Sequence, residues 1–125
     1  MRFARLTFLI AGIYGLLALV PLYFLKQQIG RGYPPPITHP EYYYGFVGVA
    51  VAWQLAFIVM SRNPVRYRPL MLVGVVEKAS FFIPVLLLYL QQHVSSSMLG
   101  GALIDGLLGV LFAISYLRTG KDPRW

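Results

Sequence analysis

The chain has 125 residues, of which 58% are hydrophobic and 12% are charged, and its formal net charge is +7. Soluble domains carry about 25% charged residues, so this composition is typical of an integral membrane protein, and its length fits a single domain over residues 1–125. The sequence contains no cysteine, which excludes disulfides, thiolate metal sites and thiol catalysis.

Four apolar runs follow one another along the chain, each close to the ~20 residues that a bilayer-spanning helix needs. They cover about residues 6–25, 43–60, 70–91 and 98–117. The first run begins after Arg2 and Arg5, as a signal peptide would. It continues without a small-residue cleavage site, so we expect a retained anchor. The sequence therefore predicts an all-α, four-helix transmembrane bundle.

The connections between the runs carry residues that begin or end helices. The first connection is expected to be extended because of its prolines, Pro34, Pro35, Pro36 and Pro40. Pro69 suits the first turn of the third span. Ser97 is the predicted N-cap of the fourth span.

Basic residues are distributed unequally between the two sides of the predicted bundle. Lys26 and Arg31 stand on one side, and eight stand on the other: Arg2, Arg5, Arg62, Arg66, Arg68, Arg118, Lys121 and Arg124. An excess of basic residues marks the cytoplasmic side, so both termini are predicted to be cytoplasmic. Arg62, Arg66 and Arg68 are expected to contact anionic lipid head groups. Because the charge flanks apolar runs, the pattern argues against nucleic-acid binding.

Small residues recur at four-residue spacing in several runs. Examples are Ala11 with Gly15, Ala102 with Gly106, and Gly109 with Ala113. This spacing lets helix backbones approach closely in lipid. It favours ordinary contacts inside the bundle over a dedicated dimerisation face.

Polar side chains interrupt the apolar runs near their middles. The charged ones are Glu77 and Lys78 in the third run and Asp105 in the fourth. At a rise of ~1.5 Å per residue, their depths differ by about 10 Å or less. The uncharged ones at this level are Tyr14, Gln54 and Ser80. Charges at the bilayer centre cost at least ~2.5–3.5 kcal/mol each, so such residues face protein or water and often have a function.

These residues have a structural and a functional interpretation. Adjacent helix positions point about 100° apart, so Lys78 is expected to pair with only one of the two acids. The other acid, lying in an apolar setting, is expected to be largely protonated. The cluster then either holds the bundle together by hydrogen bonds, or lines a small-molecule pocket, or moves ions or protons. The residues alone leave these possibilities open.

A weaker hypothesis concerns His39, Glu41 and His93, which would lie on the side opposite the termini. Two histidines and a carboxylate are a ligand set for a transition metal. No spacing in the sequence demands such a site, and we expect neither a metal nor a cofactor.

The stretch "SRNPVRYRPLMLVGVVEKASFF", followed by "LIDGLLGVLFAISYLR", resembles a set of small bacterial four-span membrane proteins of unassigned function, which are distantly DoxX-like. The resemblance spans most of residues 41–118 and departs from the pattern at Asn63, where the family has an acid. It implies a location in the bacterial inner (plasma) membrane.

The sequence predicts a small integral membrane protein that binds a lipophilic small molecule or serves as an accessory subunit of a membrane complex. Its expected partners are membrane lipids and a larger complex or a homo-oligomer. The alternatives are a proton-coupled transporter and a membrane enzyme that uses Glu77 and Asp105 as acid and base on a lipid-like substrate. We favour a non-enzymatic role. A binder or an enzyme needs a cavity of about 300 Å³ or more at the carboxylates, whereas an accessory subunit should be packed solid there.

Overall fold

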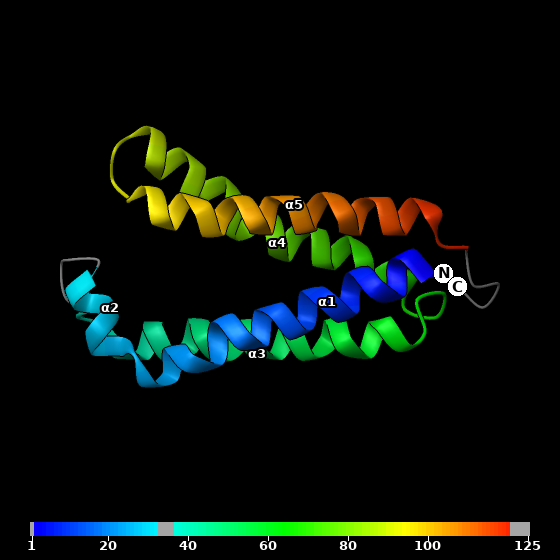
Figure 1. The fold of residues 1–125 in the computed structure, drawn as a ribbon, viewed down its shortest axis with the longest axis horizontal. Helices are drawn as coiled ribbons and strands as arrows, with labels where there is room; N and C mark the ends of the chain where they lie inside the picture. Colours follow the sequence, from blue (N-terminus) through cyan, green and yellow to red (C-terminus); the bar gives the residue numbers. More distant parts are fainter. Residues whose placement is uncertain (1, 33–36, 121–125) are drawn as a thin grey trace.

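The computed structural model describes residues 2–32 and 37–120 (Figure 1). Its elements, in chain order, are α1 (Arg2–Leu19), the 3-10 helix η1 (Val20–Phe24), α2 (Lys26–Gly32), α3 (Pro40–Arg62), α4 (Arg68–Leu90) and α5 (Ser96–Arg118). Within the described residues, four helical segments are long and apolar enough to cross a membrane: α1 with η1, α3, α4 and α5. The predicted all-α four-helix bundle is confirmed, and the chain is an integral membrane protein by this criterion. The side on which the termini lie stays a prediction.

The spanning helices are longer than the apolar runs that predicted them. Each covers 23 residues, which corresponds to about 34 Å of rise and exceeds the hydrocarbon core of about 30 Å. The runs were counted from apolar residues alone, whereas each helix begins two or more residues before its run, and α3 and α5 also end beyond theirs. Pro40 illustrates the difference, because it is the first residue of α3 and not part of an extended connection. Proline suits this position, since the first turn of a helix needs no N–H from it.

The connection after α1 contains more helix than the sequence predicted. Pro21 cannot donate the N–H that an α-helix requires, and the chain tightens there into η1. The short helix α2 follows directly and was not predicted. The expectation for Pro34, Pro35 and Pro36 lies outside the described residues.

The turns that flank α4 and α5 confirm one prediction and correct another. Pro69 lies in the first turn of α4, as predicted. The N-cap of α5 is Ser95, whose hydroxyl accepts a hydrogen bond from the Met98 amide at 3.3 Å. The prediction of Ser97 is wrong: the helix begins at Ser96, so Ser97 lies inside its first turn. Three serines in a row left the cap ambiguous in the sequence.

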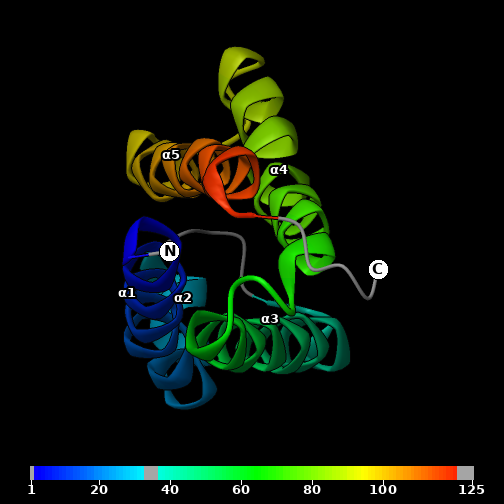
Figure 2. The ribbon, with the colours of Figure 1, turned by 90° about the vertical axis from the view of Figure 1, so that its right-hand side faces the viewer.

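The helices pack as two pairs. α1 runs along α3, and α4 runs along α5, as both views in Figures 1 and 2 show. Contact between the pairs comes mainly from α1 and α5, whereas α3 and α4 touch little although a short loop joins them. α1 begins, and α5 ends, at the same end of the bundle (Figure 1).

The apolar core lies in the half of the bundle nearest the termini. Phe8, Phe57 and Phe112 form its centre, with ring centroids 4.2 Å apart for Phe8 and Phe112 and 4.9 Å apart for Phe57 and Phe112. The other buried members are Ala4, Ala11, Met60, Met71 and Leu108. Gly74 brings α4 close, because a Cβ there would lie 3.1 Å from the Phe112 ring and 3.2 Å from the Phe57 ring. We call residues 2–15, 54–78 and 105–120 the packed half.

The other half of the bundle is much less packed. It comprises residues 16–32, 37–53 and 79–104, and we call it the splayed half because the two helix pairs diverge toward this end in Figure 1. Among these described residues, the buried ones are Gly30, Val47, Val85 and Ala102. The bundle is therefore closed where α1 begins and α5 ends, and it is loosely packed at the opposite end.

Candidate functional site

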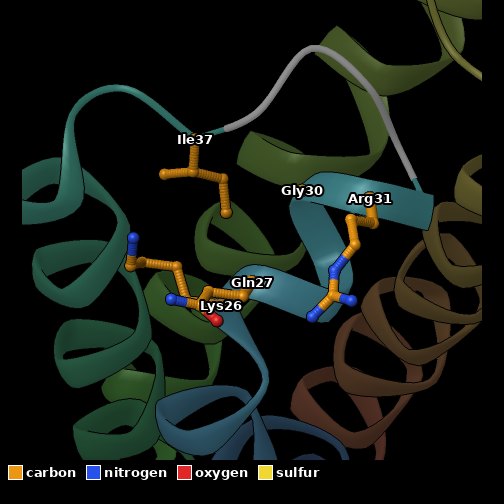
Figure 3. A pocket seen from close by; sticks show the side chains of 5 residues that line it. All are labelled: Lys26, Gln27, Gly30, Arg31 and Ile37. Atoms are coloured by element: carbon orange, nitrogen blue, oxygen red, sulfur yellow. The ribbon is translucent and has the colours of Figure 1, made fainter.

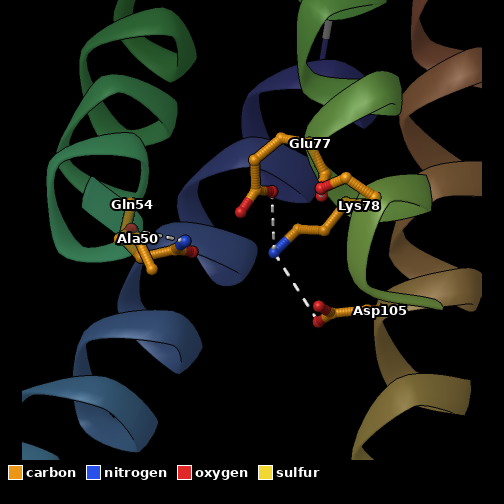
Figure 4. A network of polar contacts seen from close by, with 6 residues as sticks. Ala50, Gln54, Glu77, Lys78 and Asp105 are labelled. Atoms are coloured by element: carbon orange, nitrogen blue, oxygen red, sulfur yellow. Dashed lines mark hydrogen bonds and ion pairs between the residues drawn. The ribbon is translucent and has the colours of Figure 1, made fainter. Parts of the chain in front are cut away.

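Three charged side chains meet where the packed half ends. Lys78 of α4 places its Nζ 3.5 Å from Oε2 of Glu77 and 3.7 Å from Oδ1 of Asp105 on α5 (Figure 4). The expectation that Lys78 would pair with only one acid is wrong. Adjacent Cβ atoms do diverge on a helix, but the four-carbon lysine stem is long enough to reach back to Glu77 while it also meets Asp105.

The three side chains differ in their exposure. Lys78 is 3% exposed, whereas Glu77 and Asp105 are 19% and 21% exposed. The ammonium is thus sealed in, and the carboxylates form the accessible side of the cluster. Burying an ammonium without partners would be strongly unfavourable, so the carboxylates are what makes this position tolerable.

The packed half also contributes to the surroundings of Lys78. Its Nζ lies 5.2 Å from the centroid of the Phe57 ring on α3, within cation–π range. Gly109 of α5 makes room for the stem, since a Cβ there would lie 3.3 Å from Cβ of Lys78. Lys78 therefore rests on the aromatic core and closes it toward the splayed half.

Gln54 brings α3 into the site. It is 1% exposed, and its Nε2 donates to the Ala50 carbonyl at 2.9 Å. Its Oε1 is buried without a hydrogen-bond partner among the described residues. Figure 4 shows its carboxamide directed from α3 toward the side on which Glu77 and Lys78 lie. Gly15 of α1 is needed for this position, because a Cβ at Gly15 would overlap the Gln54 side chain.

Tyr14 and Ser80, the other predicted members, take part less directly. Tyr14 is 38% exposed and lies within electrostatic reach of Asp105. The Ser80 hydroxyl donates to the Glu77 backbone carbonyl at 2.7 Å, so it bonds to its own helix. One turn further on, Pro84 has no N–H for the Ser80 carbonyl, yet α4 remains continuous through it. The structure thus brings together Glu77, Lys78 and Asp105, directs Gln54 toward them, and leaves Ser80 aside.

Arg68, the first residue of α4, has a role that sequence reasoning missed. Arg68 donates from Nε to the carbonyls of Tyr116 at 3.1 Å and Thr119 at 3.0 Å, and its guanidinium lies 3.7 Å from the Tyr116 ring centroid. It satisfies carbonyls at the C-terminus of α5 that have no partner within the helix. No pattern in the sequence near Arg68 predicts a contact between residues so far apart in the chain. Arg62 and Arg66 are exposed, and their contact with lipid head groups stays a prediction.

The histidines do not assemble with carboxylates into a larger group. Nδ1 of His39 lies 3.3 Å from Oε1 of Glu41, and both side chains are exposed. Across residues 2–32 and 37–120, no group of three or more His, Cys, Asp or Glu side chains is placed to hold a metal ion. The pair His39–Glu41 is thus an ordinary surface contact within the described chain.

A pocket of about 270 Å³ lies in the splayed half, away from the charged cluster. It is lined by Lys26, Gln27, Gly30, Arg31 and Ile37. Sequence reasoning missed it because α2, which supplies most of its lining, was not predicted. In Figure 3 the Lys26 and Arg31 side chains extend to different sides of α2, so their charges do not converge on one point.

Comparison with known proteins does not assign the chain to a family or a function. No protein-family model matches the chain, and neither the curated proteins nor the solved structures include a significant match.

Proposed function

We propose that this membrane protein binds a lipophilic small molecule whose polar end contacts the carboxylates of Glu77 and Asp105. The single observation that carries the proposal is the difference in exposure within the cluster. Lys78 is 3% exposed, while the two acids keep 19% and 21% of their side chains accessible. A cluster that served only to hold helices together would gain from keeping water away from all three charges equally, because water weakens the pairing.

The packing of the bundle supports the same proposal. Glu77 and Asp105 belong to the end of the packed half as its residues are defined above, and the two helix pairs diverge toward the opposite end of the bundle (Figure 1). The tail of a lipophilic molecule would lie among the apolar side chains of the splayed half. The pocket described above does not reach the carboxylates, so it does not supply the cavity of about 300 Å³ expected there for a binder. The ligand would instead lie in the space between the helix pairs.

The proposed setting is the bacterial inner membrane, with both termini in the cytoplasm. The unequal distribution of basic residues supports the orientation. The resemblance of the stretches around Glu77 and Asp105 to small bacterial four-span, distantly DoxX-like proteins supports the location. In this orientation the splayed half faces the periplasmic leaflet.

The test is identification of molecules that accompany the purified protein. The full chain is extracted in polymer-bounded native nanodiscs, and its lipid fraction is compared by mass spectrometry with that of the Asp105→Asn variant. Asn keeps the size of the side chain and leaves Glu77 to pair with Lys78, so the fold should persist. We expect a lipophilic compound enriched at least about tenfold with the wild-type chain. Equal lipid fractions from two folded proteins would refute the proposal.

The accessory-subunit alternative is addressed by the same preparation. Loose packing in the splayed half, where Gly30, Val47, Val85 and Ala102 are the buried described residues, also suits a surface that a membrane partner covers. A protein that co-purifies stoichiometrically, without any enriched small molecule, would favour this alternative. Chemical conversion of the enriched compound by the wild-type chain would favour the membrane enzyme.

A further inference from the structure

The polar atoms that the two carboxylates of the site offer to a ligand are hydrogen-bond acceptors. Lys78 supplies the donors of the cluster, and they are engaged: Nζ lies between Glu77 Oε2 and Asp105 Oδ1 and over the Phe57 ring. The ion pairs involve Oε2 of Glu77 and Oδ1 of Asp105, and each carboxylate has a second oxygen. These oxygens accept hydrogen bonds and cannot donate them when the acids are ionised.

Gln54 adds an independent acceptor to this set. Its Oε1 is buried and has no partner among the described residues, although the whole side chain is only 1% exposed. Buried polar atoms are nearly always hydrogen-bonded, so an exception calls for a partner that is absent from the chain itself. Nε2 donates one of its two hydrogens to the Ala50 carbonyl, and Oε1 is the acceptor atom of Gln54 that has no partner. Its carboxamide points toward the charged side chains (Figure 4).

The charge of the cluster favours the same kind of partner. Glu77, Lys78 and Asp105 together hold two acidic groups and one basic group, and Lys78 is the only basic residue away from the span ends. With both acids ionised, in contrast to the expectation of one protonated acid, an additional cation would bring the cluster to neutrality, which is the favourable condition for charges within a membrane. A carboxylate or phosphate head would instead place a third negative charge beside the first two.

We propose that the ligand is a lipophilic amine, bound by its protonated nitrogen to the second oxygens of Glu77 and Asp105. This inference rests on the proposed function, since it names the class of molecule that the same site takes. The ammonium donates to the two carboxylates, Gln54 supplies a further acceptor on the α3 side, and the hydrocarbon tail extends into the splayed half. Fatty acids and other lipophilic anions are rejected.

The test uses three probes that share one tail and differ in their heads: hexadecylamine, hexadecanol and palmitic acid. The full chain is reconstituted in nanodiscs of zwitterionic phosphatidylcholine, and binding is measured at neutral pH by native mass spectrometry. We expect the amine to bind at least about tenfold more tightly than either other probe, because a hydrogen bond between charged groups contributes more than a neutral one.

Variants distinguish the site from general partitioning of the amine into the nanodisc. Glu77→Gln and Asp105→Asn should each weaken amine binding about tenfold or more, since each removes one accepting charge. Each also leaves Lys78 with one carboxylate, so the fold should persist, as thermal unfolding monitored by circular dichroism will verify. The matched control is Glu41→Gln, an exposed acid paired with His39 at the far end of α3, which should leave amine binding unchanged.

The outcomes separate this inference from the proposed function. Equal or tighter binding of palmitic acid or hexadecanol would overturn the amine assignment, while the proposal of a lipophilic ligand would stand. Amine binding that is the same in the wild-type chain and in both folded amide variants would also overturn the assignment. If none of the three probes binds and no compound is enriched in native nanodiscs, both proposals fall.

Discussion

The role of Lys78 in stability is open to a direct measurement through Lys78→Met. Methionine keeps an unbranched stem of similar length, so the change removes the ammonium with little change in volume. It leaves Glu77 and Asp105 facing each other without the cation that lies 3.5 Å and 3.7 Å from their oxygens. Breaking a buried ion pair by removing one partner costs about 3–5 kcal/mol. Because each acid is about a fifth exposed and can take up a proton, we expect the lower end, about 3 kcal/mol.

The assay is reversible unfolding of the protein in mixed micelles, driven by increasing sodium dodecyl sulfate. Trp53 is a local reporter, because its ring centroid lies 6.0 Å from that of Phe57, which in turn lies beneath Lys78. The sequence contains two tryptophans, so a Trp125→Phe background makes Trp53 the only one. The matched control is Lys26→Met, the same chemical change outside the cluster, for which we expect an effect within about 0.5 kcal/mol.

A compensated variant tests the cause of the loss. Adding Glu77→Gln and Asp105→Asn to Lys78→Met removes the two charges left without a partner, and it should recover more than half of the lost stability. A Lys78→Met protein as stable as the wild type would refute the reasoning. So would a compensated variant that is no more stable than Lys78→Met alone.

Three further predictions concern the bundle as a whole. Gly15→Ala should destabilise the fold by about 1–3 kcal/mol in the same unfolding assay, because the new Cβ overlaps the Gln54 side chain. Its control is Gly100→Ala, which meets no atom within 4 Å and should be neutral or stabilising by up to about 1 kcal/mol. Arg68→Gln should cost about 1.5–3 kcal/mol, since the charge-assisted hydrogen bond that Nε shares between two carbonyls at the end of α5 is lost; wild-type stability would contradict that assignment. A phosphatase reporter fused after Trp125 should be inactive and a fluorescent-protein reporter active, and the reverse would show that the C-terminus is periplasmic.

The sequence predicted the spans well because hydrophobic length is a property of local composition. It also predicted that polar groups on different helices would lie at one depth, since depth follows from counting residues along a helix. Lys78 and Asp105 are accordingly in contact. Counting residues along the helix could not reveal that Lys78 also reaches Glu77. That contact depends on the path of the flexible lysine side chain and not on the direction of its Cβ.

Other features of the fold could not be predicted from the local sequence, for physical reasons. The hydrogen bonds of Arg68 join residues 48 and 51 positions apart, and nothing near Arg68 distinguishes it from Arg62 or Arg66 as the residue that makes them. The spacing of Ala11 and Gly15 indicated close helix contact, but not that Gln54 would occupy the space at Gly15. The contrast between the packed and the splayed half depends on the angles between helices, which periodicity does not encode.

The pairing of α4 with α5 has a consequence for how the protein enters the membrane. Glu77, Lys78 and Asp105 all belong to this one helical hairpin, whose two helices are neighbours in sequence. A translocating segment that carried any of these charges alone would incur a partitioning cost of about 2.5–3.5 kcal/mol. The hairpin can instead leave the translocon with its ammonium already held between two carboxylates. Biogenesis of the second half of the chain therefore does not have to wait for the first half to be in place.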